Sequence, residues 1–168
     1  MEKLHSKQFI IRFMVVGVLL VSLFCLFLSK YEMRITEFDT STCTPLTEED
    51  GAVYQMIYAA KGYNNFRRKI IVETSGYAYI AGKETNDVGI HVLLTNLRTG
   101  VTYKMPTFMG TRPDITEAAG DGINYDNCAF QSGVYTKDES FMNDRFAISI
   151  LYETGDEKYI IETDAFLE

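Results

Sequence analysis

The sequence predicts an all-β protein, an antiparallel β-sandwich of the jelly-roll or immunoglobulin-like kind, behind one N-terminal transmembrane helix. Three observations lead to this prediction. An apolar run, unbroken from Phe13 to Ser29, lies near the start of the 168-residue chain. After it, short stretches alternate apolar and polar residues with a period of two, as half-buried strands do. Turn residues separate these stretches at close intervals, which is typical of sandwiches and, as the alternative, of barrels.

The apolar run from Phe9 to Ser29 predicts a membrane anchor. At about 1.5 Å per residue, roughly 20 helical residues cross a hydrocarbon core of about 30 Å. Arg12 interrupts the run near its start, where a long side chain can reach the headgroups. A cleaved signal peptide is the alternative, but the apolar core is long and no small-residue cleavage site follows it. We therefore expect a signal-anchor, with a cytoplasmic tail over 1–8 and the membrane segment over 9–29.

The flanking charges set the expected orientation. Lys3 and Lys7 precede the run with Glu2 as the only acid, whereas the distal flank mixes bases with several acids. Positive charge stays on the cytoplasmic side. The protein is therefore expected to be a single-pass protein of the cell membrane, with its N-terminus in the cytoplasm and its C-terminal domain extracellular.

Composition narrows the partners of that domain. From Tyr31 onward the chain has 12 Lys and Arg against 22 Asp and Glu, a net charge of about −10. Such an acidic domain argues against nucleic acid as a partner. No phosphate loop, zinc spacing or dinucleotide fingerprint occurs, so no cofactor is expected. Cys43 and Cys128 would both face an oxidising space, which leaves open a disulfide between them or two unpaired thiols.

The region between anchor and strands gives mixed signals. Residues 30–50 are polar and rich in threonine, which indicates a stalk or linker before a sandwich over 51–168. Thr47 and the acids after it would suit the start of a helix. Tyr54, Met56 and Tyr58 alternate as in a strand, so local signals over this stretch are divided.

From Gly62 onward the period of two dominates. Turns are expected over 96–100 and 154–156, and an irregular stretch rich in Gly, Asp and Asn over 107–127. Strands are expected over 69–73, 76–81, 88–95, 101–105, 130–135, 145–153 and 158–163.

The sequence gives only weak signals for metal binding and for catalysis. One loop carries oxygen ligands of the kind that calcium takes, namely Asp114, Asp121, Asn124, Asp126 and Asn127, but their spacing is not that of an EF-hand and tight turns use the same residues. We therefore expect no metal. His91 is the only histidine beyond the anchor, and no G-x-S-x-G elbow accompanies it. No catalytic residue and no enzyme activity are expected.

The string from Thr111 to Thr116, TRPDIT, is the most distinctive of the domain. Pro113 fixes its own φ and biases Arg112 toward an extended backbone. Arg112 would then pair with a carboxylate and hold the loop against the sheet. An arginine that faces a ligand is the alternative.

Four strings give the chain a resemblance to a known module. They are Gly76–Ile80 (GYAYI), Arg112–Thr116 (RPDIT), Asn124–Phe130 (NYDNCAF) and the terminal hairpin that begins at Arg145 (RFAI). In this order they resemble a small β-rich module of membrane-anchored cell-envelope proteins of Firmicutes, especially clostridia, over roughly Gly51 to Asp164. The resemblance implies that the stretch from Gly51 to Ala59 is the first strand. Similar modules are found behind a single anchor or appended to membrane proteins and glycosyltransferases of surface-polymer synthesis, and the resemblance names neither an activity nor a ligand for this chain.

The expected function is therefore that of a non-catalytic extracellular β-sandwich that binds or positions a cell-surface polymer, for example a glycan. The alternative is a protein-interaction subunit of an envelope polysaccharide-synthesis or membrane complex, which would dock through a sheet edge. Tyrosines offer stacking faces with a polar tip. The candidate ligand-binding residues are Tyr77, Tyr79, Arg112, Asp114, Asn124, Tyr125 and Asp126.

Overall fold

The computed structural model describes the backbone of residues 2–32 and 34–168, and the side chains of 11–27 and 34–168. The chain divides into two compact units, Met1–Arg34 and Ile35–Glu168. The first unit contains a single helix, α1 (Glu2–Glu32). Within the described part of the chain, no helix has both the length and the apolar character that crossing a bilayer requires.

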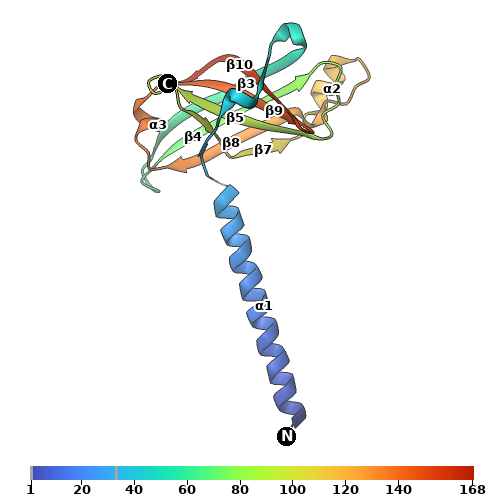
Figure 1. Ribbon diagram of the computed structural model, residues 1–168, viewed down its shortest axis with the longest axis vertical. Coiled ribbons are helices and arrows are strands. Elements are labelled where there is room, and N and C mark those ends of the chain that lie inside the picture. The colour runs from blue at the N-terminus through green and yellow to red at the C-terminus, as the bar shows by residue number, and fades with distance from the viewer. Residues whose placement is uncertain (1, 33) are drawn as a thin grey trace. The chain divides into compact units, whose positions relative to one another are not determined.

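The second unit is a β-sandwich of two sheets, as the sequence predicts (Figure 1). Short helical segments connect the strands: η1 (Thr40–Thr42), η2 (Glu48–Asp50), α2 (Pro113–Ala119), η3 (Asp126–Cys128) and α3 (Ser140–Asn143). The six-stranded sheet has the order β1 (Thr36–Glu37), β6 (Thr102–Lys104), β5 (Val88–Asn96), β9 (Phe146–Thr154), β10 (Glu157–Leu167) and β2 (Thr44–Leu46). The four-stranded sheet has the order β3 (Ala52–Asn64), β4 (Lys69–Ile80), β8 (Ala129–Thr136) and β7 (Thr107–Gly110).

The core lies between the two sheets. Every second residue of β4 is buried from Ile70 to Ile80, and Phe146, Ile148 and Ile150 of β9 face it from the other sheet. Burying one such branched or aromatic side chain contributes about 1.5–3 kcal/mol. The apolar and polar residues alternate along the strands because every second side chain packs into this shared apolar layer.

The prediction of a stalk or linker over residues 30–50 is wrong, because β1 and β2 lie within this range and belong to the six-stranded sheet. β1 pairs with β6 at one edge, and β2 pairs in parallel with β10 at the opposite edge. The connection between them, residues 38–43, must cross one face of that sheet, and the inner face is filled by the core. These residues form a strap over the outward face (Figure 1). Strands of two and three residues are too short to show a period in the sequence.

Two buried leucines on the outward face of the six-stranded sheet explain why the strap packs there. Leu93 of β5 and Leu151 of β9 are completely buried, yet neither belongs to the core between the sheets. The alternation along β5 and β9 places them on the outward face, which is the face that the strap crosses. At its start, the Phe38 amide donates to the Thr102 carbonyl at 2.9 Å, and the Lys104 ammonium lies 5.9 Å from the centre of the Phe38 ring. The strap is therefore part of the folding unit.

Strand β3 resolves the divided signals over 47–60 in favour of a strand. Its register with β4 runs from Ala52 opposite Ile80 to Asn64 opposite Lys69, with a bulge at Ile57. Gly76 lies opposite this bulge. A Cβ at Gly76 would be 2.3 Å from the Gln55 carbonyl oxygen and 2.7 Å from the Phe130 ring. The close approach of the two backbones therefore requires glycine at this position.

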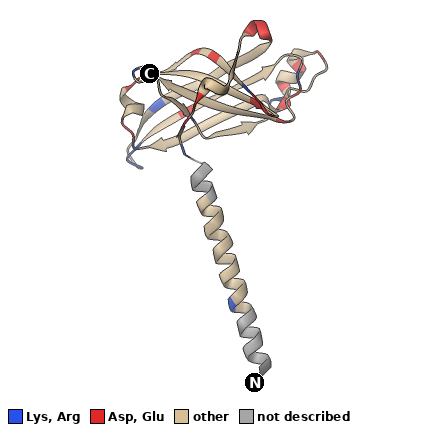
Figure 2. Ribbon diagram, viewed as in Figure 1, with Lys and Arg blue, Asp and Glu red and all other residues tan. Residues whose placement is uncertain are grey.

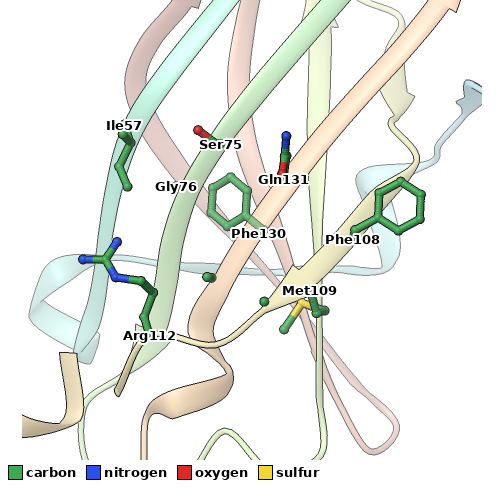
Figure 3. A pocket seen from close by; sticks show the side chains of 10 residues that line it. Ile57, Ser75, Gly76, Phe108, Met109, Arg112, Phe130 and Gln131 are labelled. Carbon is green, nitrogen blue, oxygen red and sulfur yellow. The ribbon is translucent and has the colours of Figure 1, made fainter. Parts of the chain in front are cut away.

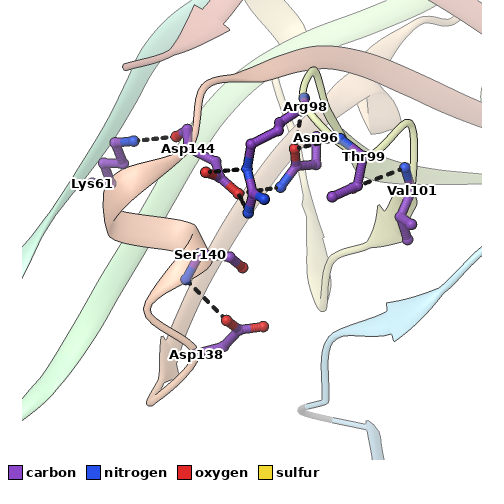
Figure 4. A network of polar contacts seen from close by, with 8 residues as sticks. All are labelled: Lys61, Asn96, Arg98, Thr99, Val101, Asp138, Ser140 and Asp144. Atoms are coloured by element: carbon purple, nitrogen blue, oxygen red, sulfur yellow. Dashed lines mark hydrogen bonds and ion pairs between the residues drawn. The ribbon is translucent and has the colours of Figure 1, made fainter.

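A polar network joins the β5–β6 turn to the segment before β9 (Figure 4). The buried Asn96 accepts hydrogen bonds from the Arg98 and Thr99 amides and donates to the Asp144 carboxylate at 2.7 Å. Arg98 binds both oxygens of that carboxylate, and these bonds together lower the pKa of Asp144 to about 2. The Lys61 ammonium donates to the Asp144 carbonyl at 2.6 Å. The network fixes three segments that are distant in the sequence.

Candidate functional site

The outward face of the four-stranded sheet carries side chains in rows that cross the strands. One row contains Gln55, Tyr77, Ala129 and Gly110, one from each strand. The next row contains Tyr58, Ser75, Gln131 and Phe108. In the second row the middle strands thus place Ser75 and Gln131 between large residues at the two sheet edges, and in the first row Ala129 and Gly110 are small. This contour leaves a depression across the sheet.

The depression is a shallow hollow of ≈ 240 Å³, which we call the groove (Figure 3). Ile57 of β3 and Phe108 of β7 bound it, and each is 57% exposed. Ser75 and Gln131 contribute its polar side chains, and Arg112 lies at its side. It is lined by Ile57, Ser75, Gly76, Phe108, Met109, Gly110, Arg112, Ala129, Phe130 and Gln131. Exposed apolar walls with a few hydrogen-bonding groups are characteristic of binding sites for small or extended ligands.

Arg112 pairs with a carboxylate, as expected, and holds its loop to the sheet. Its guanidinium binds both oxygens of Asp114 at 2.7 and 2.6 Å and lies 5.6 Å from the centre of the Tyr77 ring on β4. Its amide donates to the Asp126 carbonyl at 2.7 Å. Hydrogen bonds from Arg112 lower the pKa of Asp114, so the two opposite charges lie side by side at the groove. The pair contributes no net charge to it.

Tyr125 is not a stacking face for a ligand, because its side chain is completely buried. Its ring packs on Tyr79 with centroids 4.3 Å apart. Its hydroxyl donates to the Asp121 carboxylate at 2.6 Å and accepts from the Gly82 amide at 2.8 Å. Burial and the bond to Asp121 raise the pKa of Tyr125. Tyr125 and Tyr79 thus fasten the loop that follows α2 to the end of β4.

We expect Tyr125→Phe to destabilise the domain by about 1–3 kcal/mol, because the Gly82 amide loses its acceptor while the ring keeps its packing. Urea unfolding followed by circular dichroism measures this change. Tyr63→Phe is the matched control, since the Tyr63 side chain is 54% exposed. Equal unfolding midpoints for the two variants would contradict the role assigned to the Tyr125 hydroxyl.

The remaining loop oxygens take part in internal hydrogen bonds. The Asp121 carboxylate also accepts from the Ile123 amide, and Asn124 accepts from the Asp126 amide. The Asp126 carboxylate accepts from the Thr116 hydroxyl at 2.6 Å. Among the residues that the structure describes, no three His, Cys, Asp or Glu side chains converge on a point that could hold a metal ion. These residues stabilise a tight loop, which is the interpretation that the turn-forming residues favour.

Cys43 and Cys128 are free thiols, so the bridge that the sequence leaves open is not formed. Cys128 is completely buried at the end of η3, whereas Cys43 lies at the end of the strap. Burial raises the pKa of the Cys128 thiol to about 11. A thiol in that state is a packing residue and a poor nucleophile.

His91 lies on the outward face of the six-stranded sheet and contacts a carboxylate shared by three bases. Glu153 lies 3.1 Å from the His91 imidazole, 3.4 Å from Lys104 and 3.3 Å from Lys158. Burial lowers the pKa of His91 and the nearby Lys104 lowers it further, while Glu153 offsets part of the effect. Burial alone would raise the pKa of Glu153, but the three bases bring it below its ordinary value. His91 is therefore neutral at physiological pH.

We expect the fragment 35–168, in which His91 is the only histidine, to lose stability as the pH falls below 6.5. The pKa of His91 in the folded protein lies below 6.5, so the unfolded chain takes up the proton first as the pH falls. Protonation therefore stabilises the unfolded chain relative to the folded state. The contribution of His91 is complete above 6.5 and declines between that pH and the folded pKa. The corresponding decline from Glu153 falls below pH 4.5, outside this window.

Urea midpoints at roughly pH 8 and pH 5.5, on the two sides of the ordinary titration range of histidine, test this dependence. His91→Gln keeps a hydrogen-bonding side chain but does not titrate, so its midpoint is expected to change less. An identical change in the variant and the wild type would rule out His91 as the cause.

The sequence predicted the residues that fasten the loop after α2 to β4 better than it predicted the residues that line the groove. Tyr77, Tyr79, Arg112, Asp114 and Tyr125 come together at one end of β4, and Asn124 and Asp126 stabilise the adjoining loop. Only Arg112 of these lines the groove. Sequence reasoning missed Ser75, Phe108 and Gln131. Their one signal is a polar or exposed position within a strand, and it cannot be interpreted before the register is known.

The free edge of β3 has two features that protect it from pairing with another strand. The bulge at Ile57 interrupts its regular geometry. Lys61 pairs with the inward-facing Val72, and its ammonium is bound by the Asp144 carbonyl. Bulges and inward-pointing charges are devices that protect edge strands. This edge is therefore less suited to docking than the groove.

Comparisons with protein families, with curated proteins and with solved structures found no match for this chain.

Proposed function

We propose that this protein is a membrane-anchored, non-catalytic binding domain that holds a polymer of the cell surface in the groove. The observation that carries the proposal is the groove itself. It combines exposed apolar walls, Ile57 and Phe108, with the hydrogen-bonding side chains Ser75 and Gln131. Apolar ring faces and hydroxyl groups alternate along polysaccharides, and such a surface meets both.

The chemistry of the lining supports binding without catalysis. The polar side chains that line the groove are a serine, a glutamine and an arginine, with no carboxylate, histidine or thiol among its lining residues. General acid–base or nucleophilic catalysis would call for such a group within hydrogen-bonding distance of the ligand. His91 lies on the other sheet, in the ion cluster around Glu153.

The apolar run supports the proposed anchor. Its residues belong to α1, one continuous helix of 31 residues. Within 11–27, large apolar side chains from Ile11 to Phe27 are more than half exposed, and they lie on all sides of the helix. A helix that is apolar all round is typical of a membrane span. The domain would then face the outside of the cell, where surface polymers are found.

Phe108→Ala tests the proposed function. Truncation removes an exposed apolar wall worth roughly 1.5 kcal/mol or more, so binding to envelope polymer is expected to weaken about tenfold. The full-length chain in detergent is incubated with purified envelope material from the cells that naturally produce the protein, and the bound fraction is measured. Phe66→Ala is the matched control, because Phe66 is 97% exposed in the β3–β4 turn, outside the groove.

Three outcomes separate the candidate functions. Binding that Phe108→Ala weakens and Phe66→Ala leaves unchanged supports the proposal. Equal binding by all three proteins places the ligand elsewhere on the domain. No binding to polymer, together with crosslinking in membranes to a single protein, favours the interaction-subunit alternative.

A further inference from the structure

Resting on the proposed function, we propose that the polymer is an uncharged polysaccharide and that the groove holds an internal segment of it. The charge of the groove is the first argument. Arg112 is the only charged residue that lines it, and its Nε and Nη2 groups donate to the two carboxylate oxygens of Asp114. The polymer therefore meets no unpaired charge at this site.

The charge of the surroundings makes a polyanion a poor ligand. From Tyr31 onward the chain has a net charge of about −10, and acidic positions outnumber basic ones over the sandwich (Figure 2). Glu73 adds a carboxylate to the outward face of β4, in the row that follows Ser75. A polymer rich in phosphate or carboxylate would be repelled by this field. An uncharged chain is not affected by it.

The backbone at the groove favours a sugar chain over a peptide. β4 and β8 are the two inner strands of the sheet, so Ser75, Ala129 and Gln131 are paired with strands on both sides. A peptide that lay across these strands would find no free backbone groups to replace its own hydrogen bonds to water. Hydroxyl groups can instead bind the side chains of Ser75 and Gln131.

The ends of the groove indicate an internal segment. It is a shallow hollow that reaches from β3 to β7, the two edge strands of the sheet, and Ile57 and Phe108 at its two ends are each 57% exposed. Three interstrand spacings separate these edges, about 14 Å in all. A site that recognises a chain end needs a closed wall, whereas a polymer in a shallow hollow can continue over the exposed Ile57 and Phe108 side chains in both directions.

Fractionated polymer tests the charge of the ligand. Envelope polysaccharide from the cells that naturally produce the protein is separated on an anion exchanger into a neutral and an acidic fraction, and each is titrated calorimetrically with the full-length chain in detergent. We expect the neutral fraction to bind. Between ~0.01 M and ~1 M NaCl, where the screening length falls from about 30 Å to 3 Å, its affinity should change less than about twofold.

Partial hydrolysis of the neutral fraction tests the internal segment. Affinity is expected to fall once the fragments become shorter than the groove. A site for chain ends would behave in the opposite way, because hydrolysis creates more ends per gram and the amount bound would rise. Gln131→Ala is expected to weaken binding about fivefold through the loss of a hydrogen bond, and Asn143→Ala, an exposed amide on α3, is its control.

The outcomes distinguish this inference from the proposed function. Binding of the acidic fraction alone, or a tenfold loss of affinity at high salt, would overturn the inference and leave polymer binding intact. Stronger capture of short fragments would overturn the internal segment. If neither fraction binds and Phe108→Ala has no effect, the proposed function fails together with the inference.

Discussion

A fragment that begins at Gly51 is expected to be unfolded or aggregated, whereas one that begins at Ile35 is expected to fold. The shorter fragment lacks β1, β2 and the strap over residues 38–43. Leu93 and Leu151, which are completely buried in the intact domain, would then face water. Exposing each costs about 1.5–3 kcal/mol, and the strand pairing of β1 and β2 is lost as well.

The expected loss is at least about 4 kcal/mol, which is most of the stability of a marginal domain. Urea unfolding followed by circular dichroism, with size-exclusion chromatography, compares the two fragments. Leu151→Ala in the longer fragment serves as a second probe, and a loss of about 2–4 kcal/mol is expected there. If the fragment from Gly51 unfolds at the same urea concentration as the fragment from Ile35, the strap does not stabilise the fold.

Among substitutions that add a single carbon atom, Gly76→Ala is expected to reduce the stability of the domain most. The new Cβ would lie 2.3 Å from the Gln55 carbonyl oxygen, a backbone atom that cannot move without breaking the pairing at the β3 bulge. Overpacking of a rigid interior costs about 1–3 kcal/mol or more. We expect a loss of about 3 kcal/mol and a displacement of Ile57 at the groove.

Gly62→Ala is the matched control for this prediction. It lies on β3, where a Cβ would have no heavy atom within 4 Å, and its effect on stability should be within about 1 kcal/mol. Thermal or urea unfolding of the fragment 35–168 measures both variants. A Gly76→Ala variant as stable as the Gly62→Ala variant would show that the two backbones are not in close contact.

The alternating segments of the sequence determined most of the strands. β5, β8, β9 and β10 lie where a period of two predicts them, because each buries one face against the same core. β7 was missed within the expected irregular stretch, since it has four residues and its outward Phe108 is exposed. Local signals over 47–60 supported both a helix and a strand. Pairing along the whole length of β4 decided for the strand.

The role of single residues depended on contacts that sequence spacing does not reveal. Tyr77, Tyr79 and Tyr125 are alike as tyrosines, yet Tyr125 is completely buried while the other two are half-buried on the outward face of β4. Arg112 was correctly expected to pair with a carboxylate, because proline and aspartate next to it restrict the loop. Ser75 and Gln131 became visible as partners in the groove only once the register placed them opposite each other.

By itself the sequence determined that the chain combines an apolar N-terminal run with an acidic β-sandwich, because hydropathy, charge and a period of two are local properties. The tertiary structure decided that residues 36–37 and 44–46 belong to the six-stranded sheet. It also decided that the tyrosines and loop acids fasten the loop after α2 to β4, and that the groove lies beside them. The physical reason is that the strap, the fastened loop and the groove each arise from segments far apart in the chain. Strand pairing brings those segments together. A local alternation of apolar and polar residues predicts a strand but does not determine its partner strand or its register.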